Sequence, residues 1–315
     1  MPLVHRIILK SATYLRLTIG SHMTSDAEKV RQLREVLPAT SAGIYLDTAT
    51  RGPMPAETAA AMREAEDWEL RVGRVWDGRA EDVEQRSEEA RAVIAALIGA
   101  HPEHVALTYG RDDALALARE HLGTSGQVVD VTQRVGVERV DVAALNVDSV
   151  AFAADRWLLG PEGTGALWLA NGTAASLSRA LPRTALIGLA RSVGWLEMYV
   201  GLEWIHERTA ALSGRLRDVL SASPGVELLA PPDTLGAIVS FRIANWSSAQ
   251  AVEELARRAY ALVGQRSDLD AVVASVAWFN MEEELDRFAQ AVAELAVHTP
   301  DTLPRRPTLI VLGDS

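Results

Sequence analysis

Three charged residues follow apolar segments near the middle of the sequence, and folds often present reactive groups in this way. Asp130 ends the segment "QVVD" at residues 127–130, while Asp155 and Arg156 follow the apolar run 150–154 and precede a glycine-rich turn. Two carboxylates and a guanidinium could act as an acid, a base and an anion clamp. A purely structural role is the alternative, because a carboxylate that ends a strand is often a cap or an ion-pair partner.

The composition excludes several other kinds of chemistry. The chain has 315 residues, a formal net charge of -11, 48% hydrophobic residues and no cysteine. This balance predicts a soluble globular protein that does not bind nucleic acid, and a reducing, cytoplasmic location. The seven histidines are scattered, so no metal site is expected. Only Lys10 and Lys29 could supply a reactive amine.

The elements that must position these residues predict an α/β fold. Alternating strands and helices up to about residue 185 indicate a mainly parallel sheet flanked by helices. A long helical stretch at 185–220 precedes a strand, strand, helix, strand, helix order that predicts a small α+β domain. We expect domains at 23–200 and 201–315. Residues 1–22 are interpreted as a tag or other non-native extension, since residues 20–23 ("GSHM") look like a vector scar. No apolar run is long enough for a membrane helix.

Four segments share their pattern with one enzyme family. They are "IYLDTATRGPMP" at 44–55, residues 90–118 with "ARAVIAALIGAHPEHVALT", "VVDVTQ" to "DRWLLGPEGTGALWL" at 128–169, and "FNMEEELDRF" at 279–288. Together they resemble the class V aminotransferase and cysteine desulfurase family, the fold-type I enzymes that use pyridoxal phosphate (PLP). The resemblance implies a fold-type I aminotransferase-like architecture, here shortened.

The resemblance also implies particular site residues, and most of them are exchanged. The family links PLP through an imine to a lysine at the position of Arg156, and a guanidinium stays protonated and cannot be that nucleophile. Arg111 and Asp112 replace the two threonines that hold the cofactor phosphate, which an aspartate would repel. Asp155 replaces a histidine, and Val273 stands where an arginine holds the substrate carboxylate.

Two positions keep the residue that the family uses. Asp130 matches the carboxylate that pairs with the pyridine nitrogen, and Gln133 matches the residue beside the phenolic oxygen. Without the lysine, we favour the interpretation of Asp130 as an ion-pair partner. For Arg156 we favour the interpretation that it has no remaining function and pairs with Asp155 or Asp130. The alternatives are that it binds an anion or lies at an interface.

Two segments of the family are shortened in this chain. Residues 124–126 bridge a gap that holds strand and helix units in the family, and the loop that reaches a neighbouring subunit is reduced around Thr184. Missing units should leave sheet edges uncovered. A partner subunit, or the apolar segments 6–19 and 307–315, could cover them.

These observations predict a degenerate member of the family, a pseudoenzyme without covalent PLP chemistry and with no cofactor. It would act as a binding or partner subunit in a homodimer or in a heterodimer with a paralogue, or carry a reassigned pocket for a small anionic ligand. One alternative is a cysteine desulfurase-like lyase, an aminotransferase or an epimerase that holds PLP non-covalently. The other is a PLP-independent enzyme that uses Asp130, Asp155 and Arg156. Whether the chain is an enzyme stays open at this point.

Overall fold

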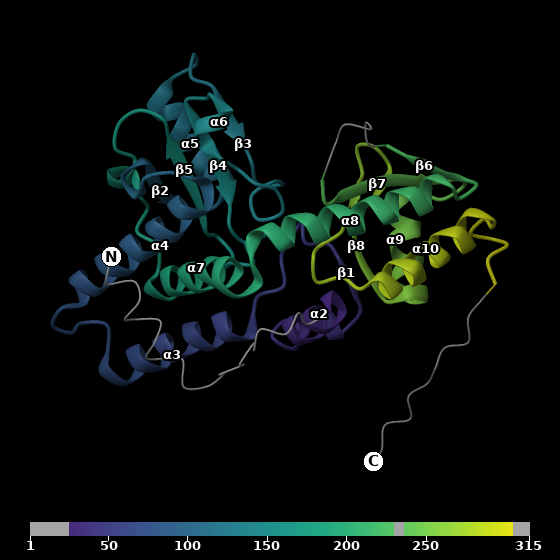
Figure 1. The fold of residues 1–315 in the computed structure, drawn as a ribbon, viewed down its shortest axis with the longest axis horizontal. Coiled ribbons are helices and arrows are strands. Elements are labelled where there is room, and N and C mark those ends of the chain that lie inside the picture. Colours follow the sequence, from purple (N-terminus) through teal and green to yellow (C-terminus); the bar gives the residue numbers. More distant parts are fainter. Residues whose placement is uncertain (1–24, 230–235, 305–315) are drawn as a thin grey trace.

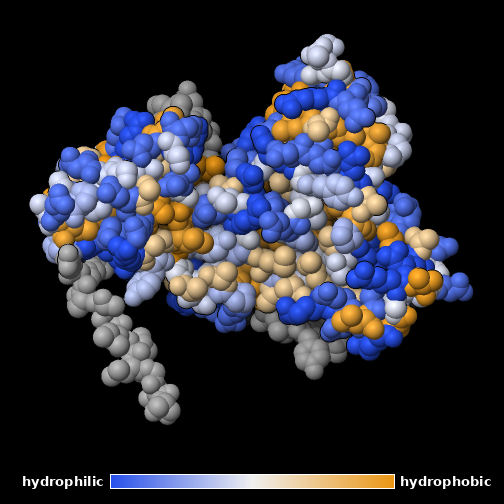
Figure 2. Space-filling view, turned by 180° about the vertical axis from the view of Figure 1, so that it is seen from behind, coloured by the Kyte–Doolittle hydropathy of each residue, from blue (hydrophilic) through white to orange (hydrophobic). Residues whose placement is uncertain are grey.

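The computed structural model describes residues 25–229 and 236–304, which form two lobes joined by a long helix (Figure 1). Seen from behind, the two lobes are separated by a notch at the top of the view (Figure 2). The expected extension at 1–22 and both apolar terminal segments lie outside the described residues.

The first lobe is built around a four-stranded sheet. Its order is β2 (Val105–Thr108), β5 (Gly165–Leu169), β4 (Ser149–Ala153) and β3 (Val128–Asp130). Only β3 and β4 are parallel, whereas β4 and β2 both run antiparallel to β5. The expectation of a mainly parallel sheet is therefore wrong in detail: β4 and β5 are joined by a turn without a helix, and such a connection returns the chain antiparallel.

Both faces of this sheet are covered, as its apolar strands require. Val150 and Phe152 of β4 belong to the core shared with α4 (Arg79–Ile98) and α7 (Arg183–Trp195). Ala151 lies on the opposite face, in a smaller core with Ala114 and Leu117 of α5 (Arg111–Leu122). Helix α3 (Ala56–Val72) packs on α7, and α6 (Val142–Leu145) leads into β4. Alternate residues of β4 thus face alternate layers.

The second lobe contains a five-stranded mixed sheet. Its order is β1 (Ile44–Leu46), β8 (Ala261–Arg266), β9 (Ala271–Ser275), β7 (Ile238–Ile243) and β6 (Val226–Leu228). Strand β1 is parallel to β8, and all other pairs are antiparallel. Helices α8 (Leu202–Ser221), α9 (Ser248–Ala259) and α10 (Glu282–Ala296) carry apolar faces into its core.

One strand of the second lobe was not expected from the sequence. The sequence of residues 248–264 has a helical pattern throughout, but α9 ends at Ala259 because Tyr260 adopts the left-handed conformation with φ +53°. The following residues form β8, so the order is strand, strand, helix, strand, strand, helix.

The long helical stretch between the lobes is also divided. Helix α7 passes into a π-helical turn at Leu196–Val200, and Gly201, with φ +91°, separates it from α8. Lys29 of α2 (Asp26–Glu35) donates to the carbonyl of Val200 at 2.8 Å and lies 3.9 Å from the ring centroid of Trp204. Helix α2 is thereby held against this junction. The division into domains at residue 200 remains a prediction.

Among the described helices, none combines the length and the apolar character that crossing a bilayer requires.

Candidate functional site

The residues singled out from the sequence lie at one end of the first sheet, after the carboxyl ends of two neighbouring strands. Strands β3 and β4 are parallel neighbours with Asp130 in register with Ala151. Asp130 ends β3, and Asp155 and Arg156 follow β4, so the three residues emerge at the same end of adjacent strands. The carboxyl ends of neighbouring parallel strands are the usual position of a site in α/β folds.

Asp130 is engaged by two donors. Its Oδ2 accepts a hydrogen bond from Nε of Arg111 at 2.5 Å, and its Oδ1 accepts from the backbone N–H of Thr132 at 2.9 Å. Arg111 is the first residue of α5, and its guanidinium nitrogen Nη1 donates to Oδ1 of Asp112 at 2.6 Å. The pair is partly exposed, with 39% of the Arg111 side chain and 31% of the Asp130 side chain accessible. The interpretation of Asp130 as an ion-pair partner agrees with this geometry, but the partner is Arg111.

The charge of Asp130 is fixed by these contacts. Partial burial raises the pKa of its carboxyl, but the hydrogen bonds from Thr132 and Arg111 outweigh that effect and hold the pKa below its ordinary value. The carboxylate is therefore ionised at neutral pH and is already neutralised by a guanidinium.

The side-chain amide of Gln133 is also engaged in hydrogen bonds within the protein. Its Oε1 accepts a hydrogen bond from the indole N–H of Trp157 at 2.8 Å, and its Nε2 donates to the carbonyl of Ala49 at 3.2 Å. Trp157 is 2% exposed, so this pairing also satisfies an indole N–H that would otherwise be buried without a partner. Gln133 thus ties the turn after β4 to the loop after β1.

Asp155 lies in that turn and is 8% exposed. Its Oδ2 is 3.3 Å from Nη1 of Arg51. The other terminal nitrogen of Arg51, Nη2, donates to Glu162 at 2.7 Å. The other carboxylate oxygen, Oδ1, is buried and has no hydrogen-bond partner among the described residues. Leaving a buried carboxylate oxygen unpaired costs about 1–3 kcal/mol, so this atom is a candidate for contact with a ligand.

Arg156 is half-buried, and its Nε has no hydrogen-bond partner among the described residues. The expectation that Asp155 or Asp130 would hold it is wrong, because Asp155 pairs with Arg51 and Asp130 pairs with Arg111. No carboxylate of the described residues lies within ion-pair distance of Arg156, which leaves it as a charged group without a compensating partner.

Arg51, Arg111 and Trp157 complete the site but were not assigned these roles from the sequence. Each partner is distant along the chain: 51 pairs with 155, 111 with 130, and 157 with 133. The only signal was that all three residues stand inside segments compared with the family.

The structure also places several residues near these positions. Thr48 is 1% exposed, and its hydroxyl has no partner among the described residues. Val273 lies in the ladder of β9 opposite Gly264 and Ser240. At the start of α5, Asp113 accepts from the backbone N–H of Tyr109. The segment 160–165 is the turn between β4 and β5, with Gly160 donating to the carbonyl of Ala154, which confirms its interpretation as a turn.

Gly52 allows the loop after β1 to touch the turn that holds Asp155 and Arg156. Its N–H donates to the carbonyl of Asp155 at 2.9 Å, and a Cβ atom at Gly52 would lie 2.0 Å from the carbonyl oxygen of Arg156. We therefore expect Gly52→Ala to lower the free energy of unfolding by about 1–3 kcal/mol in a denaturant titration.

Gly194 in α7 provides the matched control for this substitution. A Cβ atom there meets nothing within 4 Å, so Gly194→Ala should stabilise the helix by up to about 1 kcal/mol. Equal effects of the two substitutions would contradict the close packing at Gly52.

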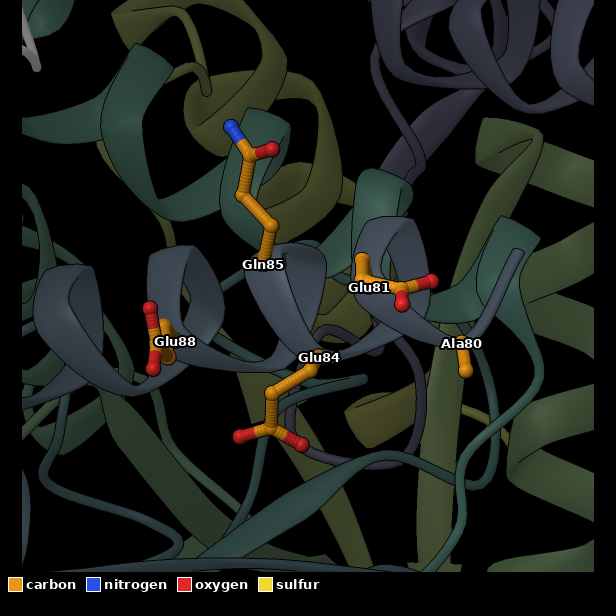
Figure 3. Close-up of a pocket in the computed structure, with 5 residues that line it drawn as sticks. All are labelled: Ala80, Glu81, Glu84, Gln85 and Glu88. Carbon is orange, nitrogen blue, oxygen red and sulfur yellow. The ribbon is translucent and has the colours of Figure 1, made fainter. Parts of the chain in front are cut away.

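Two surface hollows of the described residues lie away from this site. One, of about 460 Å³, is lined by Ala80, Glu81, Glu84, Gln85 and Glu88, and Figure 3 shows that all five come from one stretch of α4. The other, of about 430 Å³, lies between the end of α9 and α10 and includes Tyr260 and Gln290. Neither is lined by a residue of the site around Asp130 and Asp155.

Comparisons with known proteins bear on the family of this chain. The family model described as aminotransferase class-V matches residues 123–184, which include Asp130, Gln133, Asp155 and Arg156. A probable cysteine desulfurase of Methanothermobacter thermautotrophicus is 25% identical over 211 residues, or 54% of this chain and 52% of that protein. The chain therefore spans about half the length of this curated relative.

Solved structures support the same fold. The cystine C-S lyase C-DES, in complex with its reaction product cysteine persulfide, has a TM-score of 0.72 at 14% identity, over 82% of this chain and 99% of that one. An apo cysteine desulfurase from Thermococcus onnurineus NA1 also has a TM-score of 0.72, at 17% identity over 85% of this chain and 98% of that one. Identities this low show the fold alone, and they confirm the expected fold class.

Proposed function

We propose that this chain, as a shortened relative of the class V aminotransferases with the fold-type I fold, has lost covalent PLP chemistry and acts as a binding or partner subunit. The inherited site would then serve to hold two loops and a helix together, and not to hold a cofactor. The proposal concerns the chemistry of this chain and not that of its relatives.

The single observation that carries the proposal is the ion pair between Arg111 and Asp130. The pyridine nitrogen of PLP is kept protonated by donating a hydrogen bond to an ionised carboxylate, and the Asp130 carboxylate is already paired with a permanent cation. Binding the cofactor would require breaking a charge-assisted pair and leaving the Arg111 guanidinium without its partner.

Three further positions support the same conclusion. Arg156 cannot form an imine because its guanidinium does not lose a proton at working pH. Asp112, in the first turn of α5, would repel a phosphate at that helix terminus. Gln133 would have to release Trp157 before its side chain could face a cofactor. The residues present therefore do not fit PLP, and we derive no catalytic step through it.

Equilibrium dialysis against PLP tests the proposal. We expect binding well below one equivalent per chain and no saturable visible absorption band. Lys29 needs a control, because burial lowers the pKa of its amine despite the opposing effect of Asp26 and makes it more reactive towards aldehydes. Residual binding should fall in Lys29→Arg. Saturation at one equivalent per chain, unchanged in Lys29→Arg, would overturn the proposal.

A second candidate function is favoured by the unpaired atoms of the turn after β4. Asp155 Oδ1 has no donor and Arg156 Nε has no acceptor among the described residues. A ligand that reached these buried atoms would need a hydrogen-bond donor for Asp155 and an anionic group for Arg156, and it could be a bound effector or the substrate of a PLP-independent reaction.

Calorimetric titration with small carboxylates that also carry an amine would test this candidate. Binding by the native chain that is lost in both Asp155→Asn and Arg156→Met would support it. Binding that neither substitution affects would exclude these residues as the site.

A further inference from the structure

Among the described strands, β3 forms an open edge of the first sheet, whereas the opposite edge is closed. On the outer side of β2, the backbone N–H of Leu107 is bonded to the hydroxyl of Ser178, and its carbonyl accepts from the N–H of Arg179. Strand β3 pairs only with β4 among the described strands, and Figure 1 shows it at the margin of the sheet. An edge of this kind can template the addition of another strand.

The hydrogen bonds of β3 show which backbone groups are free. The carbonyl of Gln127 accepts from Ser149, and the N–H of Val131 donates to Ala151. Because the ladder uses alternate residues, Val129 also faces β4, while Val128 and Asp130 face outwards. The backbone N–H and C=O of Val128 and Asp130 form no hydrogen bond with any described residue. As far as the described residues go, the edge therefore presents two free donors and two free acceptors.

The side chains of this edge are less covered than those of the interior strands. All five residues of β4 and all five of β5 are buried, whereas none of the three residues of β3 is. Val128 packs against the small core under α5, and Val129 packs against the larger core on the opposite face. Both valines are only half-buried, so an added strand would cover apolar surface on each side of the sheet.

We propose that β3 pairs with β3 of a second copy of this chain, antiparallel about a two-fold axis at Val129. In this register Val128 lies opposite the partner's Asp130, and the reverse pair follows by symmetry. The two pairs form four backbone hydrogen bonds, which use every free donor and acceptor on both edges. Val129 then lies opposite the partner's Val129, a β-branched pair that is favourable across strands.

Neither the charge nor the residue types of β3 oppose its pairing with β3 of a second copy. Asp130 is the charged residue of β3 and is neutralised by Arg111, so two copies bring no uncompensated carboxylates together. The segment 127–130 contains no lysine and no proline, the residues that commonly protect an edge strand from pairing. The pairing does not depend on whether the chain has lost PLP chemistry.

Single cysteines provide the sharpest test, because the chain has none of its own. The Cα atoms of Val129 and its symmetry mate would be about 4.5 Å apart, the spacing of a non-hydrogen-bonded antiparallel pair, which a disulfide can span. Val128 and its mate would be diagonal neighbours at about 7–8 Å, which is beyond ordinary disulfide reach.

We expect Val129→Cys to form a disulfide-linked dimer under mild oxidation at least about ten-fold faster than the adjacent control Val128→Cys, as seen on non-reducing gels. For the native chain, light scattering should give twice the chain mass of 34.0 kDa as the concentration rises. Val128→Pro removes an outward N–H without disturbing the ladder to β4, so it should be monomeric with an unchanged circular dichroism spectrum.

Three results would overturn the proposal. They are equal cross-linking rates for the two cysteine variants, a native chain that stays monomeric at high concentration, and a folded Val128→Pro variant that still forms the dimer. PLP binding is measured separately, so none of these results decides the proposed function.

Discussion

The double variant Arg156→Lys with Arg111→Ala should bind PLP at least about ten-fold more tightly than Arg156→Lys alone. The lysine supplies the missing primary amine, but in the single variant the Asp130 carboxylate stays paired with Arg111 at 2.5 Å. Removal of the guanidinium frees that carboxylate for the pyridine nitrogen. A hydrogen bond to a charged group contributes about 1.5–3 kcal/mol, which corresponds to a factor of about 10 to 100 in affinity.

The affinities would be measured by absorption titration in a Lys29→Arg background, so that this amine does not contribute. Arg111→Ala alone is the matched control and should not gain a saturable band, because it still lacks the amine. If the single variant Arg156→Lys bound PLP as tightly as the double variant, Arg111 would not be the group that blocks the site.

Trp278→Ala should lower the free energy of unfolding by about 3–5 kcal/mol. Trp278 is 2% exposed, and its ring centroid lies 5.9 Å from that of Trp195, 6.0 Å from Trp204 and 5.3 Å from Phe279. It follows β9 of the second lobe but belongs to the main core of the first lobe. Its removal therefore creates a cavity at the place where the two lobes are held together.

Chemical denaturation would measure this loss, with Trp278→Phe as the control that keeps an aromatic ring. The phenylalanine variant should lose less than half as much, because it retains most of the contacts with Trp204 and Phe279. The carbonyl of Trp278, which accepts from Nε of Arg208 at 2.8 Å, is present in both variants. Equal losses would contradict this expectation, because the aromatic ring kept in Trp278→Phe would then contribute nothing.

The fold could be predicted from the sequence to the level of its class. Strands β4 and β5 are continuous apolar runs bounded by turn residues, and α10 has a clear helical period, so local chemistry indicates these elements. The end of α9 could not be placed, because residues 261–264 continue a helical pattern and only the left-handed conformation of Tyr260 ends it. Strands β4 and β5 pair antiparallel because a turn without a helix connects them. The expectation of alternating strands and helices did not allow for this connection.

The site could be predicted in position but not in its contacts. Asp130, Asp155 and Arg156 do emerge together, because they follow the neighbouring parallel strands β3 and β4. Their partners could not be predicted, because which arginine reaches which carboxylate depends on three-dimensional packing. Arg51, and not Arg156, pairs with Asp155, and the close approach at Gly52 brings it there.

We propose that this chain carries no lysine positioned to bind PLP covalently, and borohydride reduction can decide this. The protein would be saturated with PLP, reduced with borohydride and examined by intact mass and peptide mapping. We expect mainly unmodified protein, with at most substoichiometric labelling of Lys10, Lys29 or the amino terminus. One phosphopyridoxyl group per chain at a single residue would contradict it.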